Sequence, residues 1–428
     1  MFKKISKKFK SDDGRLVLTN FISLSVLQVL NVILPLITMP YLVRILGPEY
    51  FGLLAIATSI ITYFSIITNY GFDITATREI SVNREDKEKI IEVYSSVMML
   101  KFIFLIISFI ILAIVIFSIE KFATNWEIYF LTFLVLIGQV LFPVWFFLGM
   151  EQMKYITYLN VFSKTIFTIL IFILVKHQED YYLVPILTSL GFLFVGLLSI
   201  FIINKKFSIP FKFQKKETLR YHLYEGWHIF TSNISVTLYT TTTIVLLGFF
   251  TNNTIVGCYS IADKLIGGIK QLIAPISQTL YPFISRKANE SKEAVLRIIK
   301  KITYFSISFT LLLTIFIYIY AEQLLFLVFG KEANNAILIF KILTIIPLLV
   351  VIDTIFGTLL MLVFKRNKEY SRIILSAGFL NLILALLLIP FYEGVGAALS
   401  VLIVELYISI RIFIYTYKNG LSIFKRKQ

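Results

Sequence analysis

The sequence predicts an all-α integral membrane protein with about 12 transmembrane helices, arranged as two pseudo-symmetric six-helix lobes around a central cavity. Three observations lead to this fold class. Of the 428 residues, 58% are hydrophobic and 15% are charged, whereas a typical soluble domain is about half apolar and a quarter charged. Apolar segments of about 20 residues follow one another along the whole chain. A short block of sequence recurs at the same place in each half.

The apolar segments set the number of spans, because a helix needs about 20 apolar residues to cross the hydrocarbon core. None of them alternates apolar and polar residues as an outer-membrane strand does, so each is predicted to be helical. The basic N-terminal stretch is followed by a full-length span, which predicts a retained tail rather than a cleaved signal. The predicted spans are residues 16–45, 50–69, 94–118, 127–149, 155–175, 181–203, 222–250, 254–284, 302–328, 336–363, 373–391 and 394–417.

The basic residues orient the chain in the membrane. With the N-terminus inside, 31 lysine and arginine residues lie in the cytoplasmic tails and loops, and only four lie in the outward loops. This bias predicts a multi-pass membrane protein with both termini in the cytoplasm. The net charge of +16 therefore faces anionic lipid, and nucleic acid is not an expected partner. The predicted parts are a cytoplasmic N-terminal tail (1–15), an N-lobe (16–203), a basic cytoplasmic inter-lobe loop (204–221), a C-lobe (222–417) and a cytoplasmic C-terminal tail (418–428).

An internal repeat supports two related halves. The block "GLLAIATSI" (52–60) aligns without a gap with "GCYSIADKL" (257–265) at an offset of 205 residues. Each block lies at the turn between the first and second span of a six-span half. Because six is even, both halves enter the membrane in the same direction, which predicts a pseudo-symmetry axis along the membrane normal. Chance similarity between two apolar segments remains the alternative.

Three stretches carry a resemblance to a known family: "NFISLSVLQVLNVILPLITMPYLVRILGPEYFGLLAIA" (20–57), "NYGFDITATREIS" (69–81) and "FPVWFFLGMEQMKYITYLNVFSK" (142–164). They resemble the Wzx-type polysaccharide repeat-unit flippases, or O-antigen transporters, of the multidrug/oligosaccharidyl-lipid/polysaccharide exporter superfamily. The resemblance implies two six-helix lobes around a central cavity. It also implies translocation of undecaprenyl-pyrophosphate-linked oligosaccharide repeat units from the cytoplasmic to the outer leaflet of the bacterial cytoplasmic (inner) membrane, for assembly of O-antigen or another surface polysaccharide.

The implied partners are that lipid-linked oligosaccharide and the membrane lipids. The resemblance leaves open a polysaccharide polymerase and a chain-length regulator as further partners, and it implies no cofactor. The alternatives are a peptidoglycan-precursor lipid flippase and a drug/cation antiporter of the same superfamily. A cation exporter needs carboxylates in its cavity, and the first six spans hold none near mid-membrane.

Charged residues inside the spans are the functional candidates, because a charge at membrane depth is costly unless it is paired or hydrated. The bases outnumber the acids, which predicts a positive lumen that attracts a pyrophosphate and repels an organic cation. A lysine acts as a point charge and can release a phosphate more readily than an arginine clamp. The bases are Lys101, Lys164, Lys264, Lys270, Lys341 and Arg411, and the acids are Asp263, Asp353 and Glu405. Lys341 and Arg411 lie within reach of an interface, where snorkelling is the simpler interpretation.

The first span adds polar residues to this set. Helical spacing places Asn31 and Thr38 on one line, with Gln28 and Pro35 close by. Such a face predicts a bent helix that lines a wet cavity, although packing between helices would also use its prolines. Arg44 is either a cavity residue or an interfacial residue that snorkels outward. The substrate-binding candidates are thus Lys164, Lys264, Lys270, Lys101, Arg44, Asn31 and Gln28.

The eighth span presents a stripe of small and polar residues, formed by Asp263, Gly267 and Lys270 at helical spacing. A cavity wall and close helix packing both use such a stripe, and its two charges favour the cavity. Asp263, Asp353 and Glu405 are candidates for ion coupling, or else structural partners of nearby bases. We expect Asp263 to pair with Lys264, and Glu405 with Arg411, in the structural case.

The sequence predicts neither an enzyme nor a metal site. No nucleophile-elbow, zinc-protease or phosphate-loop motif is present, and the longest outward loop is too short to carry a catalytic domain. The single cysteine, Cys258, cannot form an intrachain disulfide or a multi-cysteine metal site. The three histidines have no pair at the i, i+4 spacing of a helix-borne metal site.

Overall fold

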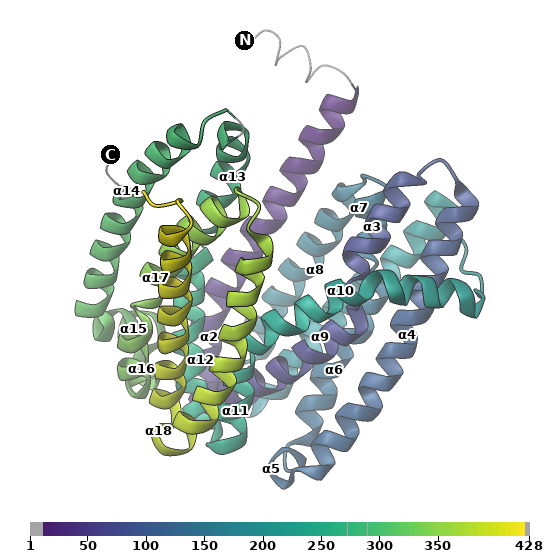
Figure 1. Ribbon diagram of the computed structural model, residues 1–428. Coiled ribbons are helices and arrows are strands. Elements are labelled where there is room, and N and C mark those ends of the chain that lie inside the picture. The colour runs from purple at the N-terminus through teal and green to yellow at the C-terminus, as the bar shows by residue number, and fades with distance from the viewer. Residues whose placement is uncertain (1–11, 272, 289, 424–428) are drawn as a thin grey trace. The chain divides into compact units, whose positions relative to one another are not determined.

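The structure is a computed structural model that describes residues 12–271, 273–288 and 290–423. These residues form helices joined by short turns, and they contain no strand (Figure 1). The prediction of an all-α protein is therefore confirmed.

Two helices are far longer than one membrane crossing. Helix α2 (Asp12–Asn69) has 58 residues and α18 (Asn367–Lys418) has 52, whereas about 20 residues suffice to cross the bilayer. Each contains one non-helical residue, Gly47 at φ 71° in α2 and Glu393 at φ 49° in α18. Gly47 has no Cβ and takes this conformation without strain, and Pro48 restarts the helix with its fixed φ. Each long helix thus covers two of the predicted spans.

The helices between α2 and the middle of the chain follow the predicted segments. Pro143 separates α6 from α7, because proline cannot donate the next helical hydrogen bond. Asp86 accepts a hydrogen bond from the Lys89 amide and caps the start of α4. These helices are α3 (Phe72–Val82), α4 (Lys87–Ser118), α5 (Glu120–Ala123), α6 (Trp126–Leu141), α7 (Val144–Gly149), α8 (Met153–Leu174), the 3₁₀ turn η1 (Gln178–Tyr182), α9 (Leu183–Ile202) and the π-helical turn η2 (Ile203–Phe207).

The second half has more interruptions. Ser291 caps α14 by accepting from the Ala294 amide. The elements are α10 (Lys216–Thr240), α11 (Thr242–Phe250), α12 (Asn253–Gln271), α13 (Ala274–Ala288), α14 (Lys292–Ile319), α15 (Ala321–Phe329), the 3₁₀ segment η3 (Gly330–Ala336), α16 (Ile337–Leu343), α17 (Ile346–Asp353), the π-helical segment η4 (Thr354–Leu362) and α18.

Eight helices in the described part of the chain are long and apolar enough to cross a membrane, or nine if the bent pair α10 and α11 forms one span. This number counts α2 and α18 once each, although each contains a break. The predicted number of 12 spans therefore stays a prediction.

The outer faces of the helices are apolar, as lipid contact requires. On α4, the residues Ile106, Ile110, Ile114 and Phe117 follow helical spacing and are 52–61% exposed. A soluble protein rarely exposes a continuous apolar stripe of this kind. The stripe supports the assignment of α4 as a membrane span.

The chain divides into two compact units. The first comprises Met1–Leu46 and Ala57–Ile234, and the second comprises Gly47–Ile56 and Ser235–Gln428. The core of the first unit gathers aromatic residues of α3, α4 and α7, including the fully buried Trp145, Phe146 and Phe147. The core of the second is built from aliphatic residues of α14, α17, η4 and α18. The lobe boundaries expected from the sequence stay a prediction.

Candidate functional site

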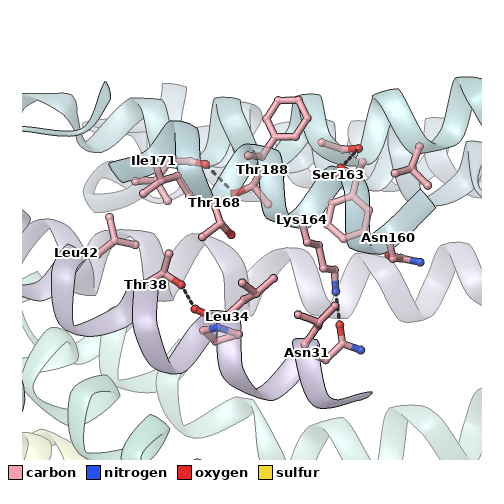
Figure 2. A pocket seen from close by; sticks show the side chains of 17 residues that line it. Asn31, Leu34, Thr38, Leu42, Asn160, Ser163, Lys164, Thr168, Ile171 and Thr188 are labelled. Atoms are coloured by element: carbon pink, nitrogen blue, oxygen red, sulfur yellow. Dashed lines mark hydrogen bonds between the residues drawn. The ribbon is translucent and has the colours of Figure 1, made fainter. Parts of the chain in front are cut away.

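The first unit contains a cavity of about 310 Å³ between α2, α8 and α9 (Figure 2). Most of its lining is apolar. Its lining residues are Leu30, Asn31, Leu34, Pro35, Thr38, Leu42, Asn160, Ser163, Lys164, Phe167, Thr168, Ile171, Val184, Thr188, Gly191, Phe192 and Val195. Among these residues Lys164 alone carries a formal charge, so the cavity combines an apolar wall with one cation.

Lys164 and Asn31 meet across the cavity. Figure 2 shows the Lys164 side chain of α8 reaching toward α2, where its Nζ donates a hydrogen bond of 2.6 Å to Asn31 Oδ1. An ammonium group has three N–H donors, and this bond uses one of them. The remaining donors of Lys164 and the amide group of Asn31 can bind an anionic group. The sequence proposed both residues, and the structure brings them together.

The hydroxyl groups of the lining serve as acceptors. Ser163 donates to the carbonyl of Gly191 and Thr188 to that of Val184, each at 2.8 Å, and Thr38 donates to the carbonyl of Leu34. Because each hydroxyl proton is already donated, the oxygen lone pairs are what these residues offer to a ligand. The lining can therefore accept hydrogen bonds from sugar hydroxyls while Lys164 donates to an anion.

Pro35 places a further acceptor beside this pair. Proline has no N–H, so the carbonyl of Asn31, four residues earlier, lacks its normal helical donor. Both residues line the cavity, where polar groups can satisfy a free carbonyl. Pro35 thus leaves the Asn31 carbonyl free to accept a hydrogen bond in the cavity.

The other candidates of the first unit lie outside this cavity. Lys101 of α4 is 1% exposed, and its Nζ lies 3.7 Å from Asp73 Oδ1 on α3. Gln28 and Arg44 lie on exposed parts of α2. The buried charge of Lys101 is therefore explained by an ion pair with Asp73, a partner that the spacing of the sequence did not reveal.

In the second unit, α12 carries the predicted stripe. Lys264 is exposed and its Nζ lies 4.7 Å from the ring centroid of Phe51, in cation–π range. Asp263 and Lys270 are half-buried. Outside its own stretch of helix, no described residue comes within 4 Å of the position that a Cβ on Gly267 would take. The stripe therefore borders open space at Gly267 rather than a tight helix contact.

Asp353 and Glu405 lie together in the second unit. Asp353 ends α17, and its Oδ1 accepts a 2.7 Å hydrogen bond from Ser409 of α18. Glu405, one turn before Ser409, is 5% exposed and lies close enough to the Asp353 carboxyl to interact with it. Arg411 lies over the ring of Tyr407 at 5.8 Å. The expected pairing of Glu405 with Arg411 stays a prediction, and the partner found for Glu405 is another acid.

Sequence reasoning missed several lining residues. On α8, Asn160, Ser163, Lys164, Phe167 and Ile171 recur at intervals of three and four residues, which places them on one face. Read together with Lys164, this spacing would have identified them. The α9 residues gave no comparable signal, because their polar groups are small and isolated.

The model of the family described as "Polysaccharide biosynthesis protein" matches residues 17–288, more than half of the chain. The chain belongs to this family. The resemblance to polysaccharide repeat-unit flippases, drawn from three stretches of its sequence, is thereby confirmed.

Two relatives cover nearly the full length. A protein of Escherichia coli (strain K12) named "Putative O-antigen transporter" is 29% identical over 408 residues, which are 94% of this chain and 97% of the relative. A protein of Shigella dysenteriae with the same name is 26% identical over 390 residues, 91% of this chain and 97% of the relative.

Two solved structures share the fold. An inward-facing multidrug resistance MATE transporter of the MOP superfamily has a TM-score of 0.68 at 13% identity, over 92% of this chain and 96% of that one. The lipid II flippase MurJ in its inward closed conformation has a TM-score of 0.67 at 16% identity, over 95% of this chain and 89% of that one. This chain shares the fold of both structures, and the predicted fold class is confirmed apart from the number of spans.

Proposed function

We propose that this protein is a flippase, which moves undecaprenyl-pyrophosphate-linked oligosaccharide repeat units from the cytoplasmic to the outer leaflet of the bacterial inner membrane. The product would serve assembly of O-antigen or another surface polysaccharide. Family membership and the two O-antigen transporter relatives support this function. The structural observation that carries it is the cavity of the first unit, in which Lys164 and Asn31 lie among hydroxyl acceptors.

The chemistry of that cavity suits a phosphorylated sugar. A lysine attracts an oxyanion, and it binds as a point charge that a carrier can release. Acceptor oxygens and apolar walls suit sugar hydroxyls and ring faces. An organic cation would need a carboxylate in its place, and the described lining residues include none. These features favour the flippase over a drug/cation antiporter.

Transport would proceed by alternating access. The two lobes would rock about the bound head group, while the polyprenyl tail remains in lipid. Lys264 and Lys270 of α12 would extend the positive lumen from the second unit. We further propose that both termini face the cytoplasm, on the ground of the charge bias. We also propose that the protein is not an enzyme, as the transporter names of its relatives suggest. A polysaccharide polymerase and a chain-length regulator would act after it.

Complementation tests this function. A strain that lacks its own repeat-unit flippase and makes the matching repeat unit should regain surface polysaccharide when this chain is expressed. The variant K164E should lose export at unchanged amounts of membrane protein, and K164R should keep part of it. Rescue of a strain depleted of its peptidoglycan-precursor flippase, without restored surface polysaccharide, would instead support that alternative function.

A further inference from the structure

In the first unit, two lysines lie at the ring of one tyrosine, at the end that the charge bias predicts to be cytoplasmic. Lys154 Nζ lies 5.6 Å and Lys206 Nζ 5.0 Å from the ring centroid of Tyr155. Lys205, next in the chain to Lys206, lies over the ring of Phe201 at 5.3 Å. Lys154 begins α8 and the other two lie in η2, so helix packing brings together charges that are about 50 residues apart in sequence.

These lysines have no acidic partner. Among the residues that the structure describes, none of the three forms an ion pair. Lysines held near one another repel, and bringing two of them to one aromatic ring gains only the modest energy of cation–π contacts. A bound anion would offset the repulsion. The three lysines therefore have the charge that an anion site requires.

The segment that follows η2 is held in place by its backbone. The amide of Lys212 donates to Ser95 Oγ at 2.9 Å, and the amide of Gln214 donates to Met99 Sδ at 3.3 Å, both on α4. Ile209 is 3% exposed and anchors the start of the segment. Ser95 and Met99 lie in the first turns of the predicted span 94–118. The segment therefore lies where that span would enter the membrane.

Two aromatic side chains of this segment point away from the protein. Phe211 is 46% and Phe213 is 87% exposed, and their ring centroids are 5.5 Å apart. In an extended chain, residues two apart lie on the same side. Exposed aromatic rings beside lysines are typical of a membrane interface, with apolar groups toward the acyl chains and ammonium groups toward the phosphates.

We propose that Lys154, Lys205 and Lys206 bind the phosphate headgroup of an anionic phospholipid of the cytoplasmic leaflet, and that Phe211 and Phe213 insert into the same leaflet. The charge of the cluster complements the anionic leaflet that the distribution of basic residues predicts on this side. The site is separate from the cavity of Lys164. Lys154 lies at the start of α8, and Lys205 and Lys206 follow the end of α9, whereas the cavity is lined by later residues of α8 and earlier residues of α9. The flippase function does not depend on it.

Lipid-dependent thermal stability tests the proposal. The full-length protein, purified in detergent, is titrated with phosphatidylglycerol or with phosphatidylcholine, and its Tm is measured at low and high salt. We expect phosphatidylglycerol to raise the Tm more than phosphatidylcholine does, and salt to reduce the difference. The triple variant K154Q/K205Q/K206Q should lose the difference, whereas the corresponding triple arginine variant should keep it.

A matched control removes the same charge elsewhere. Lys292, Lys300 and Lys301 of α14 are predicted to face the cytoplasm too, so K292Q/K300Q/K301Q should retain the phosphatidylglycerol effect. If the triple variant folds poorly, the single variant K206Q provides a second test. Native mass spectrometry would then count the phosphatidylglycerol molecules bound to K206Q, and we expect fewer than on the native protein. Equal losses in both triple variants would show unspecific surface charge and overturn the site. Stabilisation by a short-chain polyprenyl pyrophosphate but not by phosphatidylglycerol would assign the lysines to the substrate and overturn it as well.

Discussion

Gly52 and Gly257 meet backbone to backbone within the second unit. A Cβ on Gly52 would lie 2.6 Å from the amide nitrogen of Gly257, and a Cβ on Gly257 would lie 2.6 Å from the carbonyl carbon of Pro48. The two glycines hold the same position in the repeated blocks 52–60 and 257–265. The part of α2 that follows Gly47 and the first turns of α12 thus approach one another at these glycines. A pseudo-twofold relation between the two segments would produce this reciprocal contact.

Alanine at either glycine should disrupt this contact. An added methyl group would meet backbone atoms, which cannot move aside as a flexible side chain can. We expect Gly52→Ala and Gly257→Ala each to destabilise the protein by about 3 kcal/mol, the upper end for overpacking. Tm and export of surface polysaccharide measure the effect. Gly267→Ala is the control, because no described residue outside its own stretch of helix comes within 4 Å of its Cβ position. It should be neutral, or stabilising by up to about 1 kcal/mol. Equal behaviour of the three variants would contradict the close contact.

Asn31→Asp should stop transport without unfolding the protein. The new carboxylate would face Lys164 Nζ, which lies 2.6 Å from the present amide oxygen. The resulting ion pair would neutralise the cation that we assign to the substrate. We expect export to fall about tenfold or more, a loss of roughly 1.4 kcal/mol in substrate binding, with the Tm unchanged or raised. Thr188→Val, on the same cavity, keeps the charge and should be milder. Normal export by Asn31→Asp would remove Lys164 from the substrate site.

Replacing Asp73 should destabilise the protein more than replacing Lys101. Asp73→Asn leaves a buried ammonium group without its carboxylate, which costs about 3–5 kcal/mol for a fully buried pair. The Asp73 side chain is 52% exposed, so water screens part of the interaction and we expect about 1–2 kcal/mol. Lys101→Met removes the charge and fills the same space, so its effect should be within about 1 kcal/mol. A double-mutant cycle on Tm separates the two contributions. A larger loss in Lys101→Met than in Asp73→Asn would show that the pair is not the reason for the buried lysine.

The link between Arg84 and Glu151 should weaken in acid. The hydrogen bond from Arg84 at 2.8 Å lowers the pKa of Glu151 below its ordinary value of 4.5. Because the folded-state pKa is the lower one, the pair stabilises the protein above pH 4.5 and loses this contribution as the pH falls through the folded-state pKa. Both side chains are about a third or more exposed, so the effect should stay below about 1 kcal/mol. The Tm difference between the native protein and Glu151→Gln should be present at pH 7 and vanish toward pH 3. A difference that grows in acid would contradict this sign.

Fusions of a topology reporter test the orientation of the chain. A reporter after Lys216 or Arg297 should report cytoplasm, and one at Asn253 or Glu179 should report the outside, as the excess of lysine and arginine in the assigned cytoplasmic loops predicts. A cytoplasmic signal at Asn253 would exclude the arrangement of 12 spans. The membrane fraction should contain each fusion in similar amounts, so that a weak signal is not read as a location.

The sequence by itself determined the class of the protein, its helices and its family. These follow from local properties: a run of about 20 apolar residues forms a helix in lipid wherever it occurs. Proline and glycine mark helix breaks through their own backbone geometry, as at Gly47. The family is carried by stretches that can be read directly, and the excess of charge inside the spans already indicated the candidate residues.

Tertiary structure decided which of these residues act together. Lys164 meets Asn31 from 133 residues away, and Lys101 meets Asp73 across the α3–α4 packing. Asp353 and Glu405, candidates for ion coupling or for pairing with bases, lie beside one another. A periodic pattern states which face of its own helix a residue occupies, but the partner depends on how distant helices pack and rotate about their axes. That packing is a property of the whole folded chain, so no local pattern could specify these pairs.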